Sequence, residues 1–211
     1  MNYKTSRIGL IGATGKAGSV ILSELLQNNH KVIILVRDPS RLTIKYNENL
    51  SIIVGDATDA LKIDGLVRNA DIIIDASNAR KGEPPITKIV TNHLIAHMER
   101  SQKRLFVLAG KTVENESDRF SVLTLFERFL LSLLFPDIVR GKAESLNLLK
   151  ESSINWTMVR CPFIVDNDSM DFHLSEERCK GKTISKKSIA AFILDEIKKE
   201  QFIFKAPFIY N

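Results

Sequence analysis

Three glycines near the amino terminus have the spacing of a phosphate-binding turn. Gly12, Gly15 and Gly18 follow the apolar run 7–11 directly, and a helical pattern begins at Lys16. The first glycine permits a tight turn, the second lets the backbone approach a pyrophosphate, and the third lets the helix pack on the strand. Amide groups and the dipole at the helix start favour an anion. The pattern predicts a dinucleotide site made of Gly12, Ala13, Thr14, Gly15, Lys16, Ala17 and Gly18.

A mononucleotide P-loop fits the same segment poorly. That motif needs a glycine at position 10 and Ser or Thr after the Gly-Lys pair, whereas this chain has Leu10 and Ala17. The dinucleotide is therefore the preferred ligand.

The residue after the second apolar run bears on which dinucleotide is bound. Arg37 follows the run 31–36, and a guanidinium there can grip a ribose 2′-phosphate with two hydrogen bonds, helped by Arg41 or Lys16. NADP is therefore favoured over NAD. Asp38 leaves an alternative open, because it could face the ribose of NAD or serve a turn at Asp38-Pro39-Ser40.

Small and acidic residues follow the next two apolar runs. Asp56 and Ala57 come where an adenine ring is expected, and Asp56 either accepts a hydrogen bond from the adenine amino group or caps a helix over 59–67. Ala76 and Ser77 follow the fourth run, where small side chains let the backbone pass close to the nicotinamide ribose.

No metal site is expected. His93 and His97 have the helical spacing of a zinc pair, but Leu94 stands where such motifs have glutamate, and no third ligand presents itself. Cys161 and Cys179 lack Cys-x-x-Cys spacing, so they are interpreted as reduced, buried thiols.

The elements that must position these residues alternate along the chain. Continuous apolar runs at 7–11, 31–36, 51–54, 71–75, 104–108 and 156–159 are typical of strands buried on both faces of a parallel sheet. Helical periods lie at 16–28, at 86–100 and at 185–200, the last with Ser185 as N-cap. We therefore predict a Rossmann-like α/β fold with a doubly wound parallel sheet, as a single domain over 1–211. The polar segment 163–184 is expected to be a substrate-side flap without regular structure before Ser185.

Composition excludes several other classes. The 211 residues are 44% hydrophobic, enough for one globular core, and the net charge of +5 suits a phosphate-bearing ligand. Lysine clusters carry no interleaved aromatic residues, so no nucleic-acid partner is expected. Charged residues interrupt the apolar segment 120–135, so we expect no membrane span. That segment could instead line an acceptor pocket, cover its mouth, form a homodimer face or simply fill the core. Without a secretory signal, a cytoplasmic location is expected.

Together these residues resemble a known superfamily. The chain is similar to the atypical short-chain dehydrogenases/reductases, in their NAD(P)H-binding, NmrA-like and flavin-reductase-like (biliverdin reductase B-like) branch. The likeness spans nearly the whole chain, and its matching pieces are Gly12-Ala13-Thr14-Gly15-x-x-Gly18, Val36-Arg37-Asp38-Pro39, Gly55-Asp56-Ala57, Lys142-Ala143-Glu144, and the stretches 152–160, 184–192 and 205–207.

The resemblance indicates one candidate catalytic residue, a lysine, and shows that the family's catalytic tyrosine is missing here. Lys142 occupies the lysine position of the superfamily's Tyr-x-x-x-Lys motif, but Ile138 stands at the tyrosine position. The usual proton relay is therefore absent. Lys142 is expected either to hold the nicotinamide ribose, to place positive charge near an acceptor, or to be an ordinary surface lysine on an amphipathic helix.

The resemblance also implies a function. It favours an NADPH-dependent reductase of a planar acceptor such as a flavin or quinone, in which water supplies protons and positioning carries the catalysis. The residues available for that positioning are Ala109, Gly110 and Thr112 beyond the fifth strand and Pro162 and Phe163 beyond the sixth, whose backbone is expected to meet the carboxamide. A non-catalytic NmrA-like dinucleotide sensor is the alternative. A sugar-nucleotide epimerase is a third, although that chemistry normally needs the tyrosine.

Overall fold

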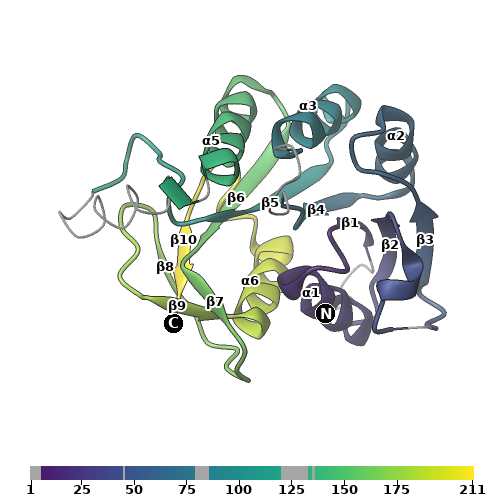
Figure 1. Ribbon diagram of the computed structural model, residues 1–211, viewed down its shortest axis with the longest axis horizontal. Coiled ribbons are helices and arrows are strands. Elements are labelled where there is room, and N and C mark those ends of the chain that lie inside the picture. The colour runs from purple at the N-terminus through teal and green to yellow at the C-terminus, as the bar shows by residue number, and fades with distance from the viewer. Residues whose placement is uncertain (1–5, 45, 79–85, 120–132, 135) are drawn as a thin grey trace.

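The chain folds as an α/β protein in which helices cover both faces of a mostly parallel sheet (Figure 1). The computed structural model describes residues 6–44, 46–78, 86–119, 133–134 and 136–211. The strands are β1 (Arg7–Ile11), β2 (Lys31–Val36), β3 (Leu50–Val54), β4 (Ile72–Asp75), β5 (Arg104–Gly110), β6 (Asn155–Cys161), β7 (Phe163–Val165), β8 (His173–Ser175), β9 (Thr183–Ser185) and β10 (Phe208–Tyr210). The helices are α1 (Lys16–Gln27), η1 (Pro39–Arg41, a 3₁₀ turn), α2 (Ala60–Asn69), α3 (Thr87–Met98), α5 (Pro136–Glu151) and α6 (Lys186–Lys199).

Strand order confirms the doubly wound prediction. The main sheet runs β3-β2-β1-β4-β5-β6-β10-β8, and every pair in it is parallel except the antiparallel pair of β8 with β10. Because the chain turns back between β1 and β4, the carboxyl ends of these two strands frame a crevice where doubly wound proteins bind their ligands.

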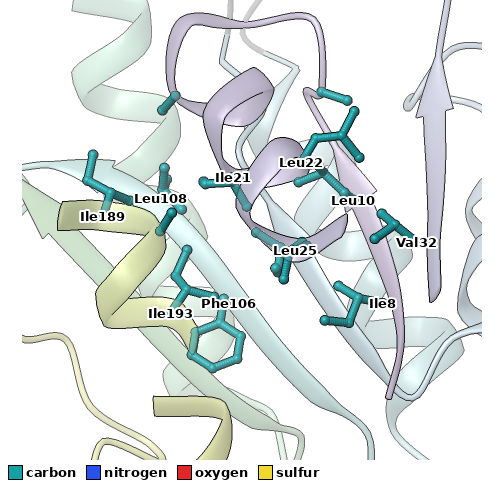
Figure 2. Close-up of a cluster of buried hydrophobic side chains, with 14 of the residues drawn as sticks. Ile8, Leu10, Ile21, Leu22, Leu25, Val32, Phe106, Leu108, Ile189 and Ile193 are labelled. Atoms are coloured by element: carbon teal, nitrogen blue, oxygen red, sulfur yellow. The ribbon is translucent and has the colours of Figure 1, made fainter. Parts of the chain in front are cut away.

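The strands are held by two apolar layers, one on each face. Alternate residues of a strand point to opposite faces, so Leu10 packs under α1 whereas Ile11 belongs to the layer under α2, α3 and α5. Figure 2 shows the first layer, in which Leu25 of α1 and Ile193 of α6 lie over the strands near Phe106. Burial of these helix faces fixes where each strand ends, and thus where the residues beyond it lie.

The six predicted strands all form, but one is buried less than expected. β3 was predicted to be covered on both faces, yet Ile52 and Val54 are 43% and 53% exposed. The physical reason is its place at the end of the sheet, beyond which the described residues form no further strand. An edge strand with this apolar composition cannot be told from a central one by its own residues.

The region after β6 also differs from the prediction. Segment 163–184 was expected to lack regular structure, but it contains β7 and β8 and enters β9, and β7 pairs in parallel with β9 in a separate two-stranded sheet. β10 was not predicted either. Each of these strands has three residues, too few for a periodic pattern, and each pairs with residues far away in sequence. The N-cap predicted at Ser185 is confirmed, since its Oγ accepts from the backbone N–H of Ser188 at 2.8 Å.

Most of the apolar segment 120–135 lies outside the described residues, and so do the roles predicted for it. Only Leu133 and Leu134 are described there, and both are exposed. Among the described helices, none combines the length and apolar character needed to cross a membrane.

Candidate functional site

A cavity of about 1030 Å³ opens at the carboxyl ends of β1, β2, β4, β5 and β6. It begins at the glycine turn before α1 and reaches the residues that follow β6. Fourteen of the seventeen predicted site residues line it: Gly12, Thr14, Gly15, Lys16, Ala17, Arg37, Asp56, Ala57, Ala76, Ser77, Ala109, Gly110, Lys142 and Pro162. The topology thus brings together residues from most of the length of the chain.

Three predicted residues lie elsewhere. Ala13 is buried in the core under α1, and Gly18 packs against the turn itself. Phe163 is 60% exposed and stands outside the cavity lining, where the Nζ of Lys111 lies 5.9 Å from its ring. Its neighbour Ile164 lines the cavity instead.

The glycine turn has the shape that close backbone approach requires. Gly12 has φ +86°, and a Cβ built there would lie 2.6 Å from the carbonyl oxygen of Ala76. A Cβ on Gly18 would lie 2.1 Å from the carbonyl oxygen of Gly12. Gly15 is the N-cap of α1 and makes no side-chain cap, so amide groups of the first helical turn stay available for an anion. These residues fit the pyrophosphate of a dinucleotide.

Arg37 lines the cavity just beyond β2, opposite a carboxylate beyond β3. Its Nη1 lies 3.9 Å from Oδ2 of Asp56. Oδ1 of Asp56 accepts from the backbone N–H and the hydroxyl of Thr58, both at 2.8 Å. The Thr58 amide is the main cause of a lowered Asp56 pKa, and Arg37 adds to it. The alternative in which Asp56 caps the next helix is wrong, because Asp59 caps α2 by accepting from the amide of Leu61.

Asp38 serves the turn that follows it. Its Oδ1 accepts from the amide of Ser40 at 3.0 Å and from the Ser40 hydroxyl at 2.7 Å, which caps η1. These bonds lower the pKa of Asp38. Of the two roles left open by the sequence, the structure supports the turn role directly.

Lys142 is not the surface lysine that one interpretation allowed. It comes from α5, is 3% exposed and lines the cavity, and its Nζ lies 3.8 Å from Oδ2 of Asp75 at the end of β4. Neither Nζ nor Oδ2 has a hydrogen-bond partner among the described residues. Burial lowers the pKa of Lys142, and the charge of Asp75 opposes that shift.

Asp75 was missed by the sequence analysis. It is fully buried, and its Oδ1 accepts from the amide of Ser77 at 2.9 Å and from the Ser77 hydroxyl at 2.5 Å. An aspartate that ends a strand of three isoleucines was the available signal, because a carboxylate is seldom buried without a partner.

The wall beyond β5 and β6 is held by a second acidic side chain that was missed. Asp118 is buried against Arg160 of β6, whose Nη1 also donates to the carbonyl of Val113 at 2.9 Å. Val113 and Thr112 line the cavity, so this pair anchors the segment that carries them. Cys161 lines it too, but burial raises the pKa of its thiol well above the ordinary value. It therefore supplies no thiolate for nucleophilic attack.

The paired histidines have other roles. Nε2 of His93 lies 3.2 Å from the carbonyl oxygen of Thr58, and Nδ1 of His97 lies 3.3 Å from Asp64. In the described part of the chain, no cluster of three or more metal-ligating side chains forms.

Comparison with known proteins agrees with this geometry. The model of the NAD(P)H-binding family matches residues 12–200. A Streptococcus pneumoniae protein provisionally named an NADH-flavin reductase superposes with a TM-score of 0.81, at 20% identity over 98% of this chain and 99% of its own. The anaerobilin reductase ChuY of Escherichia coli superposes with a TM-score of 0.80, at 17% identity over 97% of both chains. A short-chain dehydrogenase/reductase of Veillonella parvula, in complex with NADP, gives 0.78 at 18% identity over 98% of this chain and 94% of its own.

The structural neighbours share the Rossmann-like fold, and the family match covers the glycine turn together with every strand from β2 to β9. On these grounds the resemblance seen in the sequence is confirmed, and the chain belongs to the NAD(P)H-binding family.

Proposed function

We propose that the protein is an NADPH-dependent reductase of a planar, conjugated acceptor such as a flavin or quinone. The observation that carries this proposal is the extent of the cavity. It runs from the glycine turn past Arg37 at one end to the residues beyond β5 and β6 at the other. Its volume of about 1030 Å³ lies at the upper limit of the range of about 300–1,000 Å³ that small-molecule pockets occupy, which suits a ligand as large as a dinucleotide with an acceptor at its nicotinamide end.

The preference for NADPH rests on charge at the β2 end. Arg37 lines the cavity with Arg41 and Lys16, three cations that suit a 2′-phosphate. The nearby Asp38 is engaged by Ser40, so it is less available to hold the two ribose hydroxyls of NADH. The bound nicotinamide would supply a hydride, and the residues at the other end of the cavity would receive the acceptor.

Several apolar side chains form the acceptor end beside Lys142, and no described tyrosine lines it. The apolar lining residues are Ile86, Val113, Val139 and Ile164. The two described tyrosines, Tyr46 and Tyr210, do not line the cavity. Flat apolar rings match such walls, and conjugated acceptors take a hydride without a tyrosine acid. Two of the structural neighbours are named for the reduction of flavin and of anaerobilin, which supports the same class of acceptor.

The test is turnover with defined acceptors. Purified protein is mixed with NADPH and either FMN or menadione, and the loss of reduced-nicotinamide absorbance is followed. We expect steady oxidation that depends on both the protein and the acceptor. Protein that binds NADPH in calorimetry but transfers no hydride to any acceptor would overturn the proposal, and the regulatory sensor would then be the better account.

A substitution tests the choice of cofactor. Arg37→Ser is expected to raise KM for NADPH by roughly 10–100-fold, because a charge-assisted hydrogen bond contributes about 1.5–3 kcal/mol. KM for NADH should change little. Arg68→Ser is the matched control, since Arg68 pairs with Asp64 on the surface of α2. Equal losses with both cofactors would show that Arg37 does not read the 2′-phosphate.

A further inference from the structure

We propose that Lys142 is the general acid of this site and that Asp75 is the residue that positions it. This inference rests on the proposed reductase function and replaces the expectation that water supplies the proton. It assigns a task to a buried pair in which Nζ of Lys142 and Oδ2 of Asp75 have no hydrogen-bond partner among the described residues.

The first observation is an ammonium group without acceptors. Nζ of Lys142 carries three N–H donors, yet no described residue accepts from it, and the side chain is only 3% exposed. Such a group costs free energy unless something accepts its hydrogen bonds. Because Lys142 lines the cavity, a ligand in the cavity is the partner that can do so.

The second observation is how Asp75 is held. Ser77 occupies its Oδ1 with two hydrogen bonds, which leaves Oδ2 directed to Lys142 at 3.8 Å. This separation lies beyond hydrogen-bond distance but is short enough for strong attraction between buried charges. Asp75 therefore favours the protonated lysine without taking its N–H groups away from a ligand.

Other charges on the packed helices do not compete for Lys142. Lys88 of α3 and Arg140 of α5 both pair with Glu144, at 3.1 and 3.0 Å, in a more exposed cluster. The histidines of α3 contact Thr58 and Asp64. Among the described residues, Asp75 is the one charged group that shifts the pKa of Lys142, and it raises that pKa against the effect of burial.

The proton from Lys142 would complete a reduction for which bound NADPH would supply the hydride and its two electrons. Hydride transfer would leave a negative charge on a conjugated oxygen or nitrogen of the acceptor. One N–H bond of Lys142 breaks, and its proton bonds to that atom. The neutral amine regains a proton from solvent after product release. Burial lowers the pKa of Lys142 toward the working pH, which suits a general acid.

One arm of the test needs no turnover. The side-chain nitrogen resonances of lysine are followed against pH in protein with and without NADP⁺, and Lys142→Gln assigns the signal. Lys142 is expected to lose its proton below the ordinary lysine pKa of about 10.4. Asp75→Asn should lower that pH further, because the opposing charge is gone. A Lys142 signal that titrates at the ordinary lysine value and ignores Asp75→Asn would overturn the inference.

The second arm measures hydride transfer from NADPH to menadione. Lys142→Gln is expected to slow it by about 100-fold or more and to remove the loss of rate at high pH that deprotonation of Lys142 causes. Asp75→Asn should keep that loss but move it to lower pH. Lys142→Arg keeps the charge but is a poor acid, so it should not restore the rate. Lys150→Gln is the control and should behave as the unaltered protein.

The outcomes separate the two proposals. If the unaltered protein turns over and Lys142→Gln keeps its rate and pH profile, the inference is wrong and the reductase function stands. If the unaltered protein reduces no acceptor, both are wrong. If Lys142→Gln does not fold, as judged by circular dichroism, the pH profile of Asp75→Asn decides.

Discussion

Two buried ion pairs stand at the carboxyl end of the sheet, and they are built in opposite ways. The side chains of Arg160 and Asp118 are both fully buried. Nε, Nη1 and Nη2 of the arginine all donate hydrogen bonds, to the carbonyls of Ala206 and Val113 and to both carboxylate oxygens. The guanidinium also lies 3.6 Å above the ring of Phe208. Lys142 and Asp75 are buried as deeply but share no hydrogen bond.

The difference separates a structural pair from a functional one. A buried charge is tolerated when its donors and acceptors are satisfied, and Arg160 meets that condition within the protein. Lys142 does not, and it lies against the cavity whereas Arg160 does not line it. Between these two pairs, therefore, the difference lies in satisfied hydrogen bonds and in access to the cavity, and not in burial.

The largest expected effect comes from breaking the satisfied pair. Asp118→Asn leaves Arg160 buried without its countercharge, so the free energy of unfolding should fall by about 3–5 kcal/mol. Urea denaturation, followed by fluorescence of the single tryptophan, Trp156 in β6, measures the change.

Asp166→Asn is the matched control for that variant. Asp166 pairs with Lys186 at 2.7 Å, but its side chain is 85% exposed, so the loss should stay below about 1 kcal/mol. Equal effects of the two substitutions would mean that the buried network contributes no more than a surface pair.

Much of the fold could be predicted from the sequence, because the burial that stabilises the strands and helices also sets their pattern of apolar residues. The run from Val32 to Val36 is apolar throughout because both faces of β2 are covered, and α1 shows the period of a helix packed on one side. The strands β7 to β10 could not be predicted, because a three-residue strand is too short to show a hydrophobic period and its partner is distant in sequence. The exposure of β3 depends on its place at the end of the sheet, which the residues of β3 do not encode.

The residues of the candidate site also fall into those that could be predicted from the sequence and those that could not. Gly12 could be predicted because a positive φ at a tight turn leaves few residue choices. Lys142 could be placed only through the family resemblance, and its burial was unforeseen. Asp75 and Asp118 escaped because the role of a carboxylate depends on which cation the folded chain brings to it, and Lys142 and Arg160 lie far along the sequence.

The second largest expected effect is a pH dependence of the free energy of unfolding that comes from the Lys142 pair and not from the Arg160 pair. Burial depresses the pKa of folded Lys142, so between that pKa and the ordinary value of about 10.4 the unfolded chain binds more protons than the folded one. The free energy of unfolding should therefore gain a contribution that rises with pH across this window, by at most about 1.4 kcal/mol per pH unit. Urea titrations at a series of pH values should show this contribution as the difference between the unaltered protein and Lys142→Met.

Burial also lowers the pKa of Lys103, so the total slope of the unfolding free energy against pH has more than one source. The difference between the unaltered protein and Lys142→Met is what reports on Lys142. Asp118→Asn should retain the contribution, because Arg160 stays protonated throughout the window. A difference between unaltered protein and Lys142→Met that is flat with pH would contradict a depressed lysine pKa.

The smallest expected effect comes from removing the unsatisfied pair altogether. Asp75→Asn combined with Lys142→Met deletes both charges, while the new amide oxygen can still accept from Ser77. Because Lys142 and Asp75 share no hydrogen bond, the free energy of unfolding should stay unchanged or rise by up to about 1 kcal/mol in urea denaturation.

The corresponding change at the other pair, Asp118→Asn with Arg160→Met, should be destabilising, since the carbonyls of Ala206 and Val113 lose their donor. If the first double variant lost several kcal/mol, the Lys142 pair would be a structural element like the Arg160 pair. A protein that tolerates the loss of Lys142 and Asp75 in its stability but not in its chemistry has kept them for the ligand.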